Sequence, residues 1–156
     1  MIITLNPIGV VRNSRQAPED DDWGKITSEI FISEELPEES LSEIETFSHI
    51  EVIYSFHLVD EGKIEIGARH PRNNPAWPKV GIFAQRGKNR PNRLGATIAK
   101  LVRREGRTLI VTGLDAIDGT PVLDIKPVMR EFLPQGELKQ PEWSIELMQN
   151  YWEKTK

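Results

Sequence analysis

Short apolar runs separated by turn signals recur along this chain, and few of the gaps between them have a helical pattern. The run at residues 51–58 is the richest in β-branched and aromatic residues, and its alternation puts Val52, Tyr54, Phe56 and Leu58 on one face of a strand. Further strands are predicted at residues 2–5 and 8–12, 25–32, 64–68, 80–84, 98–102, 108–112 and 122–127. Because the gaps lack crossover helices, the pattern predicts a mainly β fold, either an antiparallel barrel or a sandwich.

Two stretches favour helix instead. Residues 34–46 are acidic, and Ser40 with Glu43 has the spacing of a capping box at the start of a short helix. Residues 141–152 are amphipathic and predict a C-terminal helix with an apolar stripe, formed by Ile145, Met148, Tyr151 and Trp152. This stripe covers the core in one interpretation and forms a subunit interface in the other.

The stretch from residue 80 to residue 97 combines an apolar run with a concentration of cations. Residues 80–84 predict a buried strand, which leads into a loop shaped by Gly87 and Pro91. This basic loop, residues 86–93, carries four cations: Arg86, Lys88, Arg90 and Arg93. Planar guanidinium groups suit phosphate or carboxylate, so the loop predicts an anionic partner, with a solvated surface loop as the alternative.

The distribution of charge strengthens this prediction, although the net charge is −4. Eleven cations and a single acid, Glu105, lie between residues 68 and 107. Residues 19–65 have the reverse balance, with only Lys25 and Lys63 among many carboxylates. Such asymmetry predicts a basic patch on the folded surface, of the kind that contacts nucleic acid.

Other classes of site find no support in the composition. The chain has no cysteine, which excludes disulfides and thiolate chemistry. His49, His57 and His70 lack metal-ligand spacing, so no metal is predicted. Neither an apolar run of about 18 residues nor a basic, cleavable N-terminal segment is present, and we therefore expect a cytoplasmic protein without membrane contact.

No standard catalytic signature occurs, and in particular there is no glycine-rich dinucleotide loop, P-loop or nucleophile elbow. The turn at residues 115–121 is the remaining candidate. Gly119 lets the backbone approach a ligand closely, and Asp118 offers a carboxylate on a rigid turn. The alternative is a structural β-turn in which Asp118 bonds to its own backbone.

Several blocks of the chain together resemble the TrmO family, known also as the TsaA-like or VirR-like family. The blocks follow in order over about residues 6–130: PIGVVR at 7–12, FSHI at 47–50 with FH at 56–57, GIFAQR at 81–86, NRPNRLG at 89–95 and GLDAIDGTPVLDIKP at 113–127. The last two blocks are long and specific. The resemblance implies one domain over residues 1–156, with the C-terminal helical extension at 141–153.

This resemblance implies a single-domain antiparallel β-barrel with short peripheral helices that works as a homodimer. It also implies S-adenosylmethionine-dependent methylation of tRNA at N6 of the threonylcarbamoylated adenosine next to the anticodon. Absence of a glycine-rich donor loop is consistent with a methyltransferase outside the Rossmann class.

Carried over by motif, the residues implied to bind the donor are His57, Leu58, Arg86, Ala96, Asp118, Gly119, Thr120, Pro121 and Val122. Asp118 is also the candidate catalytic residue, because a carboxylate that accepts the N6 proton would help a poorly nucleophilic nitrogen. The candidate RNA-binding residues are Arg69, Arg72, Lys88, Arg90, Asn92 and Arg93.

One segment departs from the family pattern. Where many members have a basic Arg-Gln pair after Ala-Pro, this chain has an acidic loop, Glu19-Asp20-Asp21-Asp22. This difference leaves two rivals to tRNA methylation: a methyltransferase with another RNA or small-molecule acceptor, and a non-catalytic RNA-binding barrel.

Overall fold

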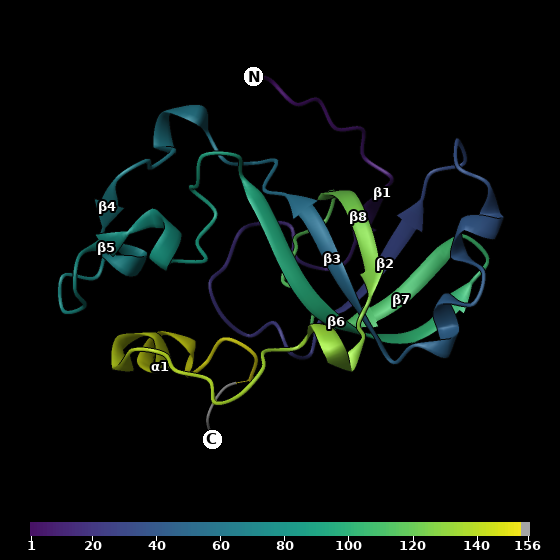
Figure 1. Ribbon diagram of the computed structural model, residues 1–156. Helices are drawn as coiled ribbons and strands as arrows, with labels where there is room; N and C mark the ends of the chain where they lie inside the picture. The colour runs from purple at the N-terminus through teal and green to yellow at the C-terminus, as the bar shows by residue number, and fades with distance from the viewer. Residues whose placement is uncertain (154–156) are drawn as a thin grey trace.

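Six antiparallel strands close into a barrel in the computed structural model, which describes residues 1–153 (Figure 1). The strand order around the barrel is β1-β2-β7-β6-β3-β8. The strands are β1 (Gly9–Arg12), β2 (Thr27–Ile32), β3 (His49–Ser55), β6 (Leu94–Glu105), β7 (Thr108–Thr112) and β8 (Pro121–Pro127). The predicted mainly β antiparallel barrel is therefore confirmed.

Alternation of side chains along the strands builds the core. On β2, Ser28, Ile30 and Ile32 are buried and their neighbours are exposed, as expected for a strand with one face inward. On β3 the buried residues include Val52 and Tyr54, which confirms the predicted face. Each fully buried aliphatic or aromatic side chain stabilises the fold by about 1.5–3 kcal/mol.

The predicted strands at residues 98–102 and 108–112 are confirmed by β6 and β7, which form a hairpin that pairs from Glu105↔Thr108 to Lys100↔Thr112. Gly106, with φ of +60°, occupies the turn between them. The N-terminal prediction is only partly correct. Residues 9–12 form β1, but residues 2–5 join no strand, and Ile2 is 94% exposed.

A small unit beside the barrel holds β4 (Ala68–Arg69) and β5 (Val80–Gly81), which pair with each other (Figure 1). The predicted strands at 64–68 and 80–84 are therefore mostly wrong. The chain leaves β5 in a 3₁₀ turn at Ile82–Ala84, where Ile82 is buried and Phe83 is 79% exposed. The apolar run at residues 80–84 therefore reflects one buried side chain, Ile82, and not a central strand of the barrel.

The helical predictions also need correction. Residues 34–46 form two 3₁₀ turns, Glu38–Leu41 and Ile44–Thr46, without a side-chain cap. The capping box fails because Glu43, with φ of +69°, adopts a left-handed conformation between the turns. Further 3₁₀ turns lie at Glu61–Lys63, Pro71–Asn73 and Arg130–Phe132.

The C-terminal helix α1 (Glu142–Met148) is shorter than predicted, and it lies next to the small unit (Figure 1). Trp77 of that unit donates a hydrogen bond of 2.9 Å from Nε1 to Glu146. Tyr151 and Trp152 lie beyond the helix, because their carbonyls accept backbone hydrogen bonds from Trp23 and Gly24. Within residues 1–153 no helix is long and apolar enough to cross a membrane.

Candidate functional site at one end of the barrel

Strand pairing brings three candidate segments to the same end of the barrel. Tyr54, near the end of β3, pairs with Gly95 at the start of β6 and with Val122 at the start of β8. The loop after β3 therefore meets the loops before β6 and β8 there. These loops carry His57, Arg86 and residues 115–120, respectively.

Arg86 is exposed, and its guanidinium donates a hydrogen bond of 2.6 Å to the carbonyl of Ala96. The preceding Gln85 fixes the base of the loop, since its amide donates to the carbonyls of Arg69 (3.0 Å) and Val80 (2.9 Å). A cation is thus held at the rim of the barrel by one of its N–H groups, while the guanidinium as a whole faces solvent.

The turn before β8 is tied to the loop that follows β1. Gly119, with φ of +80°, donates a backbone hydrogen bond of 2.8 Å to Val11, and the Asp118 carboxylate accepts one of 3.1 Å from the backbone of Asn13. The structural alternative for Asp118 is thus realised across the chain and not within its own turn. A Cβ built on Gly119 would lie 3.6 Å from Nε2 of His57, so the glycine leaves its backbone open toward the imidazole.

The remaining members of the predicted donor set differ in whether their side chains are buried or exposed. Thr120 and Val122 are buried, and their carbonyls accept backbone hydrogen bonds from Val11 (2.9 Å) and Ile8 (2.8 Å). These two residues hold the turn against β1 and the residue before it, and their side chains lie in the core. Pro121 begins β8 opposite Val10, whereas Leu58 is 60% exposed just beyond β3.

A buried cluster of hydroxyls around one carboxylate lies at the same end. Tyr54 donates a hydrogen bond of 3.0 Å to Oδ1 of Asp115, Thr97 donates to the same oxygen, and Tyr151 donates to Oδ2. Burial, and then the neighbouring Asp115 carboxylate, raise the pKa of both tyrosines far above its usual range, and Arg86 opposes this effect. Both phenols therefore stay protonated and act as donors.

Sequence reasoning missed this cluster as a site. Asp115 lies in the turn that we singled out, but the pattern predicts only one face of a strand for Tyr54 and a helical stripe for Tyr151. Tyr151 is 36 residues from Asp115, and no spacing rule connects the two. The available signal was a carboxylate at the start of a turn already chosen for its polar residues.

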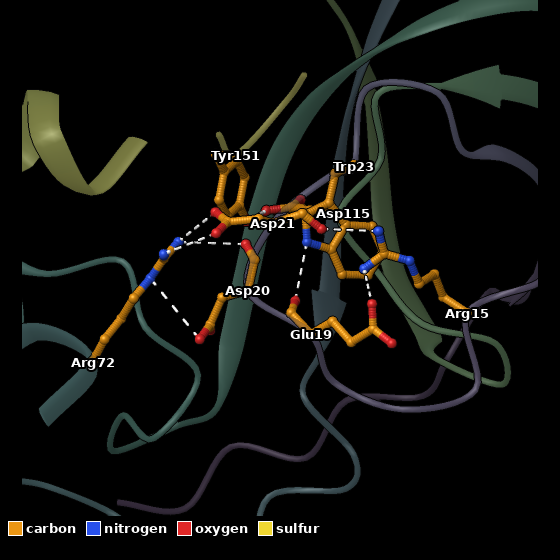
Figure 2. Close-up of polar contacts among 8 residues, drawn as sticks. All are labelled: Arg15, Glu19, Asp20, Asp21, Trp23, Arg72, Asp115 and Tyr151. Atoms are coloured by element: carbon orange, nitrogen blue, oxygen red, sulfur yellow. Dashed lines mark hydrogen bonds and ion pairs between the residues drawn. The ribbon is translucent and has the colours of Figure 1, made fainter. Parts of the chain in front are cut away.

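The acidic loop, residues 19–22, folds over Arg15 (Figure 2). The Arg15 guanidinium lies 4.4 Å from the centroid of the Trp23 ring and 3.1 Å from the Glu19 carboxylate. It also donates hydrogen bonds to the carbonyls of Asp21 (2.8 Å) and Asp22 (2.7 Å). An internal cation thus orders the loop and partly neutralises it.

The same loop binds one of the candidate RNA-binding cations. Arg72 forms an ion pair of 2.9 Å with Asp21, and its Nε lies 4.0 Å from the Asp20 carboxylate (Figure 2). Arg72 has φ of +52°, in the left-handed region that non-glycine residues rarely adopt. The pair connects the small β4–β5 unit to the acidic loop.

Other arginines of the candidate RNA set tie the basic loop to neighbouring backbone carbonyls. Arg90 donates to the carbonyl of Gln85 (2.8 Å) and Arg93 to that of Val59 (3.2 Å), whereas Asn92 is exposed and Lys88 is half-buried. Arg69 is half-buried in β4.

At the opposite end of the barrel, cations pair with acids or carbonyls. Arg104 lies 3.3 Å from Glu38, and Arg107 donates to the carbonyl of Leu36 at 2.6 Å. Part of the charge asymmetry along the sequence is therefore cancelled within the fold. Among residues 1–153, no group of three or more histidines, cysteines or acids is arranged to hold a metal ion.

The fold and this arrangement define a class of small closed antiparallel β-barrels with a polar, cation-rimmed site on the loops at one end. Within that class, the profile of the tRNA-methyltransferase O N-terminal domain matches residues 10–132. The chain belongs to this family. The match covers the barrel strands, apart from Gly9 at the start of β1, and the candidate site apart from Tyr151, which lies beyond it.

Individual relatives agree with the family match. A Homo sapiens protein named tRNA (adenine(37)-N6)-methyltransferase is 39% identical over 114 residues, covering 73% of this chain and 25% of that protein. A Pyrococcus abyssi protein named a probable S-adenosyl-L-methionine-binding protein is 37% identical over 144 residues, covering 85% of this chain and 71% of that protein. An Archaeoglobus fulgidus protein of similar name is 38% identical over 131 residues, covering 81% of this chain and 34% of that protein.

The chain thus spans about a third or less of the length of the human and Archaeoglobus relatives. Solved structures agree on the fold. The crystal structure of TrmO from Pseudomonas aeruginosa superposes with a TM-score of 0.71 at 24% identity, covering 89% of this chain and 62% of that one.

Proposed function

We propose that this chain binds S-adenosylmethionine at the described end of the barrel and methylates tRNA there. The acceptor we propose is N6 of threonylcarbamoyladenosine next to the anticodon. The observation that carries the proposal is the convergence of Arg86, His57 and the Asp118–Gly119 turn beside a cationic loop, in a chain of the tRNA-methyltransferase O family. Names of the human and archaeal relatives support the same donor and the same class of acceptor.

The residues present suit the chemistry of this donor. Its methionine part has a carboxylate and an ammonium group, and its adenosine part has ribose hydroxyls and an apolar ring. The exposed Arg86 guanidinium would hold the carboxylate, Asp118 would accept from the ammonium or the hydroxyls, and Leu58 would contact the ring. Gly119 leaves open backbone beside His57, where a side chain would fill the space.

When bound, the donor supplies an electrophilic methyl group. The protein has to align that group with the acceptor nitrogen, which depends more on fixed loops than on strong acid–base chemistry. The tie between Gly119 and Val11 and that between Arg86 and Ala96 hold the loops in place. We assign Asp118 as acceptor of the N6 proton, because one carboxylate oxygen is held by the Asn13 backbone and the other has only a 3.5 Å contact with Gln16.

Contacts to tRNA are assigned to the basic loop and to Arg69 and Arg72. Asn92 is exposed and Lys88 is half-buried, and we assign the side chains of both direct contacts with tRNA. Arg90 and Arg93 use part of their donor capacity on carbonyls and retain further N–H groups for phosphate. Binding through such cations weakens steeply as salt is added.

A homodimer and a cytoplasmic location are also part of this proposal. The outer face of β6 supports self-association, because Leu94, Ile98 and Val102 project from it and are 39–47% exposed. Sedimentation at micromolar concentration tests this assembly, for which a concentration-independent monomer would be the contrary result.

A methyl-transfer assay tests the activity. Purified protein is incubated with methyl-labelled S-adenosylmethionine and tRNA with or without threonylcarbamoyladenosine, and the digested nucleosides are analysed by mass spectrometry. We expect the label on the threonylcarbamoylated adenosine only. Label on another nucleoside would favour a different acceptor, and RNA binding without donor binding or transfer would favour a non-catalytic barrel.

A further inference from the structure

The C-terminal segment at residues 150–152 docks on residues 22–24, where the acidic loop ends, through three successive backbone hydrogen bonds. The backbone N–H groups of Asp22, Trp23 and Gly24 donate to the carbonyls of residues 150, 151 and 152 at 3.1, 2.8 and 2.6 Å, respectively. Gly24 allows the closest of these approaches, because a Cβ built on it would lie 2.3 Å from the Trp152 carbonyl oxygen. We call residues 150–152 the C-terminal strap.

From this strap the Tyr151 side chain points into the barrel end and donates its hydroxyl hydrogen to Asp115 (Figure 2). Asp115 thereby receives hydroxyl donors from three separate parts of the chain: β3 through Tyr54, β6 through Thr97, and the strap. A partly buried carboxylate whose two oxygens both accept hydrogen bonds in this way is fixed in orientation.

This carboxylate and its donor Thr97 lie close in sequence to members of the proposed donor site. Thr97 directly follows Ala96, whose carbonyl holds Arg86, and Asp115 opens the turn that ends at Gly119. Without the Tyr151 hydroxyl, Oδ2 of Asp115 would lose its donor, and the start of the turn that carries Asp118 and Gly119 would lose a contact that fixes it.

We propose that the C-terminal strap completes the donor site, with Tyr151 as a positioning residue that holds Asp115 and so fixes the turn at residues 115–119 for the donor. This inference rests on the proposed function. It extends the site to a residue outside the segment matched by the family profile, which ends at residue 132.

Two variants separate the hydroxyl from the docking of the strap. Tyr151→Phe removes only the hydroxyl, whereas Gly24→Ala pushes the Trp152 carbonyl away. We expect both to raise the Kd for S-adenosylmethionine at least tenfold in calorimetry, with and without tRNA. Hydrogen exchange of the donor-free protein should show lost protection at residues 22–24 in Gly24→Ala and retained protection there in Tyr151→Phe. Gly81→Ala, whose added Cβ meets nothing within 4 Å, is the matched glycine control.

A second control tests whether general destabilisation of the fold alone would raise the donor Kd. Ile32→Val trims a buried side chain away from the cluster and lowers the melting temperature, but it should leave the donor Kd unchanged. Tyr151→Phe that binds the donor as tightly as wild type would overturn this inference and leave the proposed function standing. Wild-type protein that binds no donor under either condition would overturn both.

Discussion

The Tyr54 ring lies directly against Gly95 on the neighbouring strand. A Cβ built on Gly95 would be 2.4 Å from Cε2 and Cζ of that ring and 2.9 Å from its hydroxyl oxygen. The glycine therefore makes room for the tyrosine that donates to Asp115. The close approach of β3 and β6 at Gly95 therefore also fixes the position of the Tyr54 hydroxyl beside Asp115.

Gly95→Ala is expected to lower the free energy of unfolding by about 2 kcal/mol, because the ring has to leave its position and the core is overpacked. Urea denaturation measures the loss. Gly81→Ala, with nothing within 4 Å of its added Cβ, should change stability by no more than about 0.5 kcal/mol. Equal stability of the two variants would be incompatible with the described packing.

Stability should also fall at high pH in a way that depends on Tyr151. Its pKa is raised in the folded state by burial and by Asp115, so the folded protein keeps the proton where the unfolded chain, with a pKa of about 10, loses it. The stabilisation is complete below pH about 10 and is lost above it, by about 1.4 kcal/mol per pH unit.

Urea denaturation of wild type and Tyr151→Phe from pH 7 to pH 11 measures this loss. The stability advantage of wild type is expected to be constant up to pH about 10 and then to shrink as pH rises. A stability advantage that grows with pH would show instead that the folded state stabilises the deprotonated form of Tyr151.

The cations near the site should differ in their effect on tRNA binding. Lys88→Ala is expected to reduce the slope of log K against log salt by about 0.7 to 0.9, the loss of one phosphate contact. Arg72→Ala should reduce it less, because Asp21 and Asp20 already neutralise part of that charge. Filter binding between low and high salt provides both slopes. A larger change for Arg72 than for Lys88 would reverse the assignment.

Asp118→Asn should abolish methyl transfer while tRNA affinity stays within about twofold of wild type, because an amide cannot accept the N6 proton. Its oxygen still accepts from the Asn13 backbone, which preserves the turn. Asp124→Asn, on β8 and paired with Lys126, is the matched control and should keep its turnover. A fully active Asp118→Asn would remove Asp118 from the chemistry.

Much of the fold was predictable from local patterns. Alternation at residues 25–32 and 51–58 identified β2 and β3, because one buried face requires period two in any half-buried strand. The run at residues 80–84 misled for the opposite reason. It has apolar content without alternation, and only Ile82 proves to be buried.

The candidate site was predictable in part. Arg86 and the Asp118–Gly119 turn were found by motif and lie at the same end of the barrel. The role of the acidic loop was not, because Arg72 is 51 residues from Asp21 and pairs with it only in the folded chain. The contact between Tyr151 and Asp115 was hidden for the same reason, because 36 residues separate the two and only the folded chain brings them together.

The central claim is a methyl-donor site held by Arg86, and calorimetric titration with S-adenosylmethionine tests it most directly. Wild-type protein is predicted to bind with micromolar affinity, and Arg86→Ala to bind at least tenfold more weakly. Arg103→Ala, which removes an equal charge at the opposite end of β6, should bind as wild type does. No binding to folded wild-type protein, with tRNA present as well as without it, would contradict the claim.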